Sequence, residues 1–352
     1  MKRFTYPQRP VIQLPFFLLA FFSLLFSVSN VKAFFMRDLF QPAPGGSLAA
    51  IAFRDTLPRN QDIDTAAYSE KMKQLANHDR SGKWPPVTAL PGKGAILPYQ
   101  RIVAFYGNFY TAGMGILGEY SAPVMIRKLK QQVKEWELAD SSTAVMPALH
   151  YIAVTAQSSP GDGTYRLRMP DAEIRKAIAL ADSVKGIVFL DLQVGLSSLQ
   201  KELPRLEKFL KMPTVHLGID PEFSMKSGNK PGTSIGTFDA ADINYAMSWL
   251  ANIVKQYQLP PKVLVVHRFT DPMLTNYKNI ITRSEVQVVI NMDGFGSPTL
   301  KKNTYRYSIY RQPVQFTGFK VFYKNDVNKG GRIMQPSEIL ALKPRPVYIQ
   351  YQ

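Results

Sequence analysis

Eight short apolar runs follow one another from Arg101 to the end of the chain, separated by more polar segments. They are nearly continuous stretches of β-branched and aromatic residues. This composition is typical of strands that are covered on both faces in a parallel sheet. The runs span residues 101–108, 145–152, 186–193, 214–223, 262–269, 287–296, 319–326 and 346–352.

Helical periodicity fills the segments between these runs. A strand followed by a helix seven times, and then a last strand, predicts an α/β fold of the (β/α)8 TIM-like barrel type whose final helix is missing or supplied elsewhere. A doubly wound open sheet is the alternative, but eight strands and the lack of a Gly-rich phosphate loop after the first run favour the barrel. The predicted helices span 121–140, 171–184, 196–212, 239–257, 271–282, a weaker segment near 298–310, and 336–342.

The first 33 residues have the layout of a secretory signal peptide. Lys2, Arg3 and Arg9 precede an apolar stretch at 14–28, and Val31-Lys32-Ala33 offers a cleavage site after Ala33. An uncleaved anchor is the alternative, although about 20 apolar residues are needed to span a bilayer. We therefore expect export to the periplasm or the extracellular space, with membrane contact only through this segment if it stays uncleaved.

Residues 34–98 form an N-terminal extension or linker ahead of a barrel domain at 99–352. Turn-forming clusters dominate it, and one helix is plausible at 64–77. The extension is either a partly ordered linker or a belt wrapped on the domain, where it could cover the place of the missing helix.

Composition narrows the chemistry. The chain has no cysteine, which excludes disulfides, thiolate metal sites, a cysteine nucleophile and a lipidated cysteine. Its net charge of +17 suggests attraction to an anionic partner, and we expect a carbohydrate or an acidic polymer of the cell envelope; the alternative is a secreted protein that is basic without such a partner, because net charge indicates partners only weakly. No nucleic-acid partner is expected, because no block of Lys and Arg is longer than two residues.

Polar residues gather at the ends of nearly all the runs. In a barrel of this type the carboxyl ends of the strands carry the active site, so the pattern predicts a polar pocket at the barrel mouth. The alternative is that strand ends border loops, which are polar in any protein. The residues are Tyr106, Asn108, His150, Gln157 in the following loop, Asp191, Gln193, Asp220, Glu222, His267, Arg268, Asn291, Asp293, Lys324, Asn325, Asp326, Gln350 and Gln352.

The fourth run, TVHLGIDPEF, ends in two carboxyls, Asp220 and Glu222. If strand geometry continues past Pro221, both side chains project from the same face. Two carboxyls in one pocket can divide the acid and base roles of glycoside hydrolysis. We expect Glu222 to be the general acid, Asp220 to orient it or the substrate, and Asp191 or Asp293 to be the second carboxylate.

The other polar strand ends are expected to bind substrate hydroxyls, and no cofactor or metal ion is expected. A metal-dependent hydrolase using His150 or His267 with Asp191, Asp220 or Asp293 is the alternative. Four histidines without an H-x-H or H-E-x-x-H motif speak against it. The expected substrate-binding residues are Tyr106, Asn108, Gln157, Gln193, His267, Asn291, Asp326 and Gln350.

Two resemblances add to this interpretation. The D-x-E of Asp220 and Glu222 looks like the arrangement in chitinase-like and lysozyme-like barrel hydrolases, without the longer DxxDxDxE run of the chitinase type. Over residues 101–352 the chain also resembles a family of uncharacterised bacterial exported proteins and lipoproteins, which implies a barrel-like domain and an envelope location but no known activity. That resemblance lies in FYGN, PALHYIAVTAQ, LDLQ, IDPEF, VVHRF, DGFG and GFKVFYKND.

The combined prediction is an exported barrel protein that acts on or binds carbohydrate, most simply a glycoside-hydrolase-like enzyme. The alternative is a non-catalytic envelope protein that binds a glycan or an acidic polymer.

Overall fold

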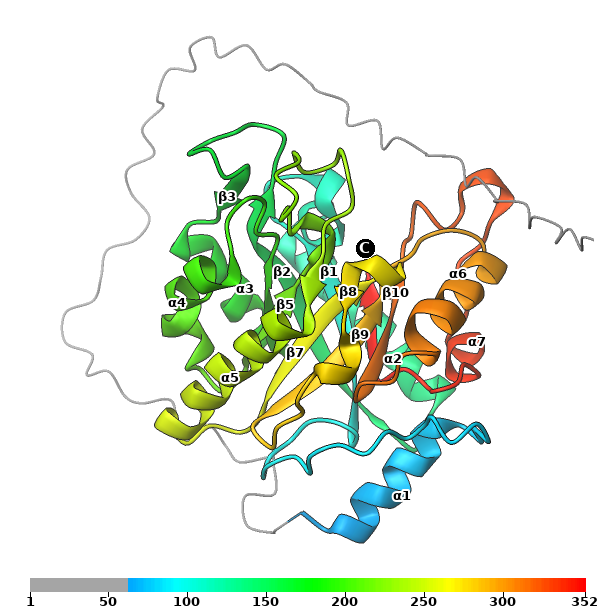
Figure 1. Ribbon diagram of the computed structural model, residues 1–352. Coiled ribbons are helices and arrows are strands. Elements are labelled where there is room, and N and C mark those ends of the chain that lie inside the picture. Colours follow the sequence, from blue (N-terminus) through cyan, green and yellow to red (C-terminus); the bar gives the residue numbers. More distant parts are fainter. Residues whose placement is uncertain (1–62) are drawn as a thin grey trace, which may run out of the picture. The chain divides into compact units, whose positions relative to one another are not determined.

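The computed structural model describes residues 63–352, and its centre is a closed barrel of eight parallel strands (Figure 1). The barrel closes because β1 pairs with β2 on one side and with β11 on the other. The predicted (β/α)8 barrel is therefore confirmed, and the open doubly wound sheet is excluded. In their order around the barrel the strands are β1 (Gln100–Gly107), β2 (Ala144–Ala156), β4 (Ile187–Leu192), β5 (Val215–Ile219), β7 (Lys262–Arg268), β9 (Val286–Met292), β10 (Phe316–Val321) and β11 (Tyr348–Tyr351).

Each predicted run overlaps one of these strands, and the seventh is displaced. β10 spans Phe316–Val321, about three residues earlier than the predicted 319–326. Lys324, Asn325 and Asp326 consequently lie beyond the strand, and the residue that β10 places at its carboxyl end is Lys320.

Helices cover the outside of the barrel near the positions predicted for them. Figure 1 shows α3, α4 and α5 along one side and α6 and α7 along the other. They are α2 (Ala122–Ala139), α3 (Asp171–Asp182), α4 (Leu199–Leu210), α5 (Ala240–Tyr257), α6 (Pro298–Thr304), which continues as the π-helix η6 (Tyr305–Tyr310), and α7 (Pro336–Leu340). No helix of the described residues is long and apolar enough to cross a membrane.

The helix predicted at 271–282 is wrong. This segment forms two 3-10 turns, η4 (Asp271–Met273) and η5 (Tyr277–Asn279), with β8 (Leu274–Thr275) between them pairing with β6 (Phe238–Asp239). The cause lies in Arg268, whose guanidinium donates to the carbonyls of Thr270, Asp271 and Leu274. Carbonyls held in this way do not serve an α-helical ladder, and Asn276 adopts a left-handed conformation.

The place of the missing last helix is closed by α2 and α7, which contact each other. Around it, Trp136 of α2 donates to the hydroxyl of Tyr351, and Tyr323 donates to Gln132. The described part of the extension lies elsewhere, so the expectation that it covers this gap is wrong for those residues.

Residues 63–99 instead close the end of the barrel opposite the mouth, where Figure 1 shows α1 (Thr65–Ala76). Tyr68, Met72 and Leu97 join the apolar residues of the barrel interior. The amide of Gln287 exchanges two hydrogen bonds with the backbone of Leu97. The predicted helix at 64–77 is confirmed, whereas the predicted signal peptide at 1–33 and residues 34–62 lie outside the described residues.

The interior of the barrel changes from apolar to polar along the strands. Ile102, Phe189, Val265 and Val289 fill it near the closed end. Side chains two residues apart share a face. Two or four residues further along each of these strands, the inward side chain therefore lies at the barrel mouth.

Candidate functional site

Polar side chains from all eight strands, or from the residue directly after a strand, point into the barrel interior at its mouth end. Each is no more than 3% exposed. Side chains two residues apart on a strand point to the same face. The strands whose apolar side chains fill the closed end of the barrel therefore also point these polar side chains into its mouth end. They are Tyr106 of β1, His150 of β2, Asp191 of β4, Asp220 after β5, His267 of β7, Asn291 of β9, Lys320 of β10 and Gln350 of β11.

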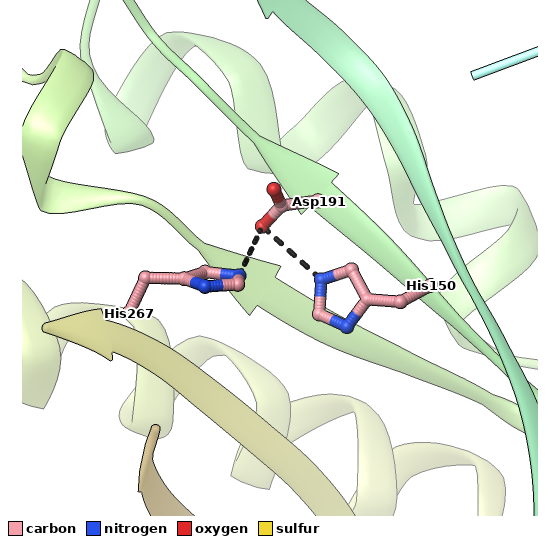
Figure 2. A group of neighbouring side chains, drawn as sticks. All are labelled: His150, Asp191 and His267. Atoms are coloured by element: carbon pink, nitrogen blue, oxygen red, sulfur yellow. Dashed lines mark ion pairs between the residues drawn. The ribbon is translucent and has the colours of Figure 1, made fainter. Parts of the chain in front are cut away.

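Three of them, His150, Asp191 and His267, meet at one point and are called the His–Asp–His triad below. In Figure 2 one carboxylate oxygen of Asp191 lies between the two imidazole rings. Asp191 Oδ1 is 3.4 Å from His150 Nε2 and 3.6 Å from His267 Nε2. One ligand atom from each residue lies within 4.8 Å of the others, so the triad has the composition and spacing of a metal site.

The far side of each triad residue is tied to a neighbour. His150 Nδ1 is 2.6 Å from the hydroxyl of Tyr348, and Asp191 Oδ2 accepts a hydrogen bond from Tyr106 at 3.1 Å. His267 Nδ1 is 2.8 Å from Asp293 Oδ2. These contacts fix the two ring orientations and turn both Nε2 atoms toward Asp191.

Asp293 joins the triad to a buried lysine. Its Oδ1 lies 2.9 Å from Lys320 Nζ, and that ammonium sits 3.9 Å from the centre of the Tyr106 ring. Lys320 is therefore held by a carboxylate and by a cation–π contact at once. The same ammonium is 4.9 Å from the Phe322 ring, which packs edge-on against the half-exposed Phe295.

Asp220 and Glu222 do not lie on a continued strand, which corrects the geometric assumption made from the sequence. The strand ends at Ile219, and Pro221–Phe223 form the 3-10 turn η3, capped by Asp220. Asp220 Oδ1 accepts the backbone N–H of Glu222 at 3.1 Å, and Oδ2 accepts from Gln193 at 3.4 Å. Proline at the first position of the turn presets its backbone, so the chain bends where the strand would have continued.

The two carboxyls nevertheless remain in one electrostatic environment. Burial raises the pKa of Glu222 to about 8, aided by Asp220 and Asp293 and opposed by Lys320 and His267. Burial likewise raises the pKa of Asp220 to about 7. Near neutral pH, Glu222 therefore keeps its proton, while Asp220 is close to its titration midpoint.

The triad shows the opposite shifts. Burial opposes ionisation of Asp191 and Asp293. The charge on His267 lowers the pKa of Asp191, and Lys320 followed by His267 lowers the pKa of Asp293. Burial also opposes charge on His267, yet the two carboxylates raise its pKa to about 10. At His150 burial outweighs the favourable contact with Asp191 and lowers the pKa to about 4. His267 is thus an imidazolium whose positive charge lies between two carboxylates, one at each ring nitrogen.

We call the acidic and basic groups gathered here, with the tyrosine that contacts them, the mouth cluster. It comprises Tyr106, His150, Asp191, Asp220, Glu222, His267, Asp293 and Lys320.

Three predicted substrate-binding residues do not face this cluster. Asn108 follows Gly107, whose φ of +143° turns the chain out of the strand, and its amide bonds Ile152 and Tyr110. Gln157 lies in the loop after β2, with its amide nitrogen 3.2 Å from the place that a Cβ at Gly161 would take. Within the described residues neither side chain forms a hydrogen bond to the cluster, and a substrate-binding role for the two stays a prediction.

Asp326 is the third of these residues, and its oxygens are fully engaged in the fold. It pairs with the buried Lys301 at 2.5 Å and accepts the backbone N–H groups of Gly296 and Phe322. These bonds join α6 to the loops after β9 and β10. Asp326 thus holds the loops together and is not free to bind a substrate.

Asn291, Gln350 and Gln193 take supporting positions. Asn291 donates to Gln350 at 3.4 Å, and Gln350 donates to the Tyr348 hydroxyl at 3.0 Å. Gln193 reaches Tyr106 at 3.3 Å as well as Asp220. The first two amides therefore act through Tyr348 on the triad, and Gln193 links the triad side of the cluster to the Asp220 side.

Two side chains that contact the candidate site were missed in the sequence, Lys320 and Tyr348. Lys320 lies inward on β10, which was predicted about three residues too late in the sequence. Tyr348 lies inward on β11, where it was assigned to no face from the sequence. Alternation within FTGFKV, with Phe316, Gly318 and Lys320 on one face, is the signal that points to Lys320.

Two surface hollows of about 410 Å³ each lie away from the mouth cluster. One is lined by Lys302, Ser337 and Glu338, among others, and the second by residues of the 271–279 segment with Gln312. Neither is lined by a residue of the cluster, so neither is taken as the site.

Comparison with known proteins adds little to this picture. No family model and no curated protein matches the chain. Among solved structures, a sugar phosphate isomerase/epimerase from Parabacteroides distasonis ATCC 8503 is 8% identical, with a TM-score of 0.33 over 73% of this chain and 88% of that one. The HPPK-DHPS protein of Plasmodium falciparum with pteroate is 11% identical, with a TM-score of 0.36 over 81% of this chain and 51% of that one. Neither likeness bears on activity, and the TIM-like barrel itself is established by the strand order and its closure.

Proposed function

We propose that this protein is a glycoside-hydrolase-like enzyme that acts on carbohydrate at the barrel mouth, with Glu222 as the proton donor. One observation carries the proposal. Glu222 is a half-buried carboxyl whose pKa is raised to about 8, and among the described residues none forms a hydrogen bond or ion pair with it. A protonated carboxyl with free oxygens is what protonation of a leaving glycosidic oxygen requires.

Asp220 acts as a positioning residue for Glu222. Its bond to the Glu222 backbone N–H fixes the turn that presents the acid, and its own carboxyl adds to the raised pKa. Removal of Asp220 should therefore disturb both the position and the acidity of the donor.

Asp293 is the better of the two candidates for the second carboxylate. Both carboxylates have their oxygens engaged, Asp191 by the two histidines and Tyr106, and Asp293 by His267 and Lys320. Of the two, Asp293 is the one whose charge raises the pKa of Glu222. Asp293 also lies on the strand-end loop that carries the exposed Phe295. An aromatic face beside carboxyl and amine groups suits the alternating apolar and hydroxyl faces of a sugar ring.

Export and an envelope partner are parts of this proposal that rest on sequence alone. They are supported by the basic and apolar order of the first 33 residues and by the net charge of +17. The same charge supports the alternative, a protein that holds an acidic glycan without cleaving it.

The test compares the purified wild type with Glu222→Gln on a panel of neutral and acidic envelope and extracellular glycans, with product release and binding measured in parallel. Glu137→Gln, an exposed position on α2, is the matched control. Loss of the proton donor should lower kcat by about 100-fold or more, with binding retained. Equal turnover by wild type and Glu222→Gln contradicts the proposal, and binding without turnover by either favours the non-catalytic alternative.

A further inference from the structure

We propose that the His–Asp–His triad binds one divalent transition-metal ion inside the barrel. The ligand atoms are His150 Nε2, His267 Nε2 and Asp191 Oδ1. This inference stands independently of the role of Glu222, because it concerns a different set of side chains and is tested without a substrate.

The spacing of the three atoms fits a shared ion better than direct hydrogen bonds. Protein hydrogen bonds between nitrogen and oxygen are about 2.7–3.2 Å long. The observed separations from Asp191 Oδ1 are 3.4 Å to His150 and 3.6 Å to His267. Two ligands about 2.0–2.2 Å from an ion at a tetrahedral angle are about 3.3–3.6 Å apart. The two separations from Asp191 thus match those of a tetrahedral ion, and the two histidine nitrogens lie within 4.8 Å of each other.

The same three atoms are buried, and among the described residues they contact one another only through these long ion pairs, with no hydrogen bond to any of them. All three residues are 0% exposed. Buried polar atoms are nearly always bonded, and a site where three unsatisfied atoms face one another calls for a group that satisfies all of them. A cation that displaces the proton of His267 meets this need, because both imidazole nitrogens and the carboxylate oxygen can then donate electron pairs.

The outer contacts are those of a supported metal site. In such sites the second ring nitrogen of a ligating histidine is held by a carboxylate or another oxygen, which fixes the tautomer. Here Asp293 takes this position at His267, and the Tyr348 hydroxyl takes it at His150. Tyr106 holds the second oxygen of Asp191. Each proposed ligand therefore has its own orienting partner.

Gly218 keeps the space beside the triad open. A Cβ at this position would lie 2.4 Å from His150 Nε2 and 2.6 Å from Asp191 Oδ1. Any residue with a side chain at position 218 would therefore clash with these two ligand atoms. The positions of the His150 ring and the Asp191 carboxylate therefore require a glycine here.

The donor set indicates the class of ion. Two imidazole nitrogens and one carboxylate suit Zn²⁺ and the neighbouring first-row ions, whereas Ca²⁺ and Mg²⁺ prefer all-oxygen sites. Three protein ligands leave coordination positions for water or for a substrate oxygen. When bound, such an ion supplies a Lewis acid within the barrel.

The experiment uses the full chain, stripped with a chelator, mixed with one equivalent of Zn²⁺, desalted and analysed for zinc by mass spectrometry. Wild type should retain about one ion per chain and gain thermal stability with zinc. His150→Ala and His267→Ala should lose retention and the thermal gain. His78→Ala, at an exposed histidine outside the barrel, is the matched control and should behave as wild type.

Two further variants keep the test decisive if a ligand variant fails to fold. Tyr348→Phe leaves every ligand in place and should weaken zinc affinity about 10- to 100-fold, the effect of losing an outer partner. Gly218→Ala should reduce retention through crowding alone. Glu222→Gln should retain zinc fully, which separates this inference from the proposed function. Wild type that retains no more zinc than folded Tyr348→Phe or His150→Ala, with no thermal gain, overturns the proposal.

Discussion

Asp220 Oδ1 accepts the backbone N–H of Glu222 at 3.1 Å, so one carboxyl holds the turn that presents the other. The bond makes Asp220 the cap of η3 and places its charge beside Glu222. The i, i+2 spacing of the two acids therefore works through a capped turn and not through a shared strand face.

Asp220→Ala should lower activity and move the alkaline limb of the kcat/KM profile to lower pH. The direction follows because the Asp220 charge raises the pKa of Glu222, so its removal lets Glu222 lose its proton earlier. Loss of the cap should also reduce the free energy of unfolding by about 1 kcal/mol. A pH–rate profile of the variant measures the shift, and an unmoved limb would show that Asp220 does not act on the donor.

Stability should fall as pH rises through neutrality, in part because of Glu222. Its pKa in the folded chain, about 8, lies above the ordinary value near 4.3, and the charges that face it belong to Asp220, Asp293, Lys320 and His267. The folded chain thus holds a proton that the unfolded chain releases. The stabilisation is complete below the unfolded pKa and is lost as pH rises through about 8.

Urea unfolding at about pH 5 and about pH 8.5 tests this sign. Wild type should lose more unfolding free energy between the two conditions than Glu222→Gln, which has no proton to lose. Identical losses in the two proteins would show that Glu222 titrates in the folded chain as it does in solvent.

Asp326→Ala should destabilise the fold without acting through substrate binding. The variant leaves the Lys301 ammonium buried without its carboxylate and removes the acceptor for two backbone N–H groups. Breaking a buried pair from one side costs about 3–5 kcal/mol. Asp171→Ala, which breaks an exposed pair with Lys208, should cost less than about 1 kcal/mol. Chemical unfolding measures both costs, and equal costs would contradict the structural role assigned to Asp326.

Leu97→Ala should show that residues 63–99 belong to the folded barrel. Leu97 is fully buried in the interior core, next to the backbone bonds that its segment makes with Gln287. Truncation of a buried leucine costs about 2–5 kcal/mol. Leu90→Ala, at a half-exposed position of the same segment, is the control. Equal melting temperatures for the two variants would contradict the packing described here.

The barrel was predictable because its strands are short, apolar on both faces and rich in β-branched residues, a pattern that depends on local composition. The structure of segment 271–282 was not predictable in this way. Arg268, from the strand before it, holds the carbonyls of its turn, and these bonds override the helical spacing of the sequence. Lys320 was missed for a related reason: aromatic residues continue past Val321, so composition alone does not mark where β10 ends.

The site was predictable in position and only partly in composition. The polar strand ends were visible, and Asp191, His267, Asp220 and Glu222 were named. That His150 faces Asp191 and His267 depends on strands β2, β4 and β7 closing around one interior, with Gly218 between them. Such a convergence leaves no spacing motif in the chain, which is why metal chemistry carried little weight before the structure.

The pH dependence of kcat/KM for wild type and Glu222→Gln, on the glycan that the panel identifies, tests the central claim most directly. Wild-type activity should fall above pH of about 8 as Glu222 loses its proton. Glu222→Gln should be about 100-fold slower or more and should lack this alkaline limb. A variant that retains wild-type activity, or that keeps the same alkaline limb, would contradict the assignment of Glu222 as proton donor.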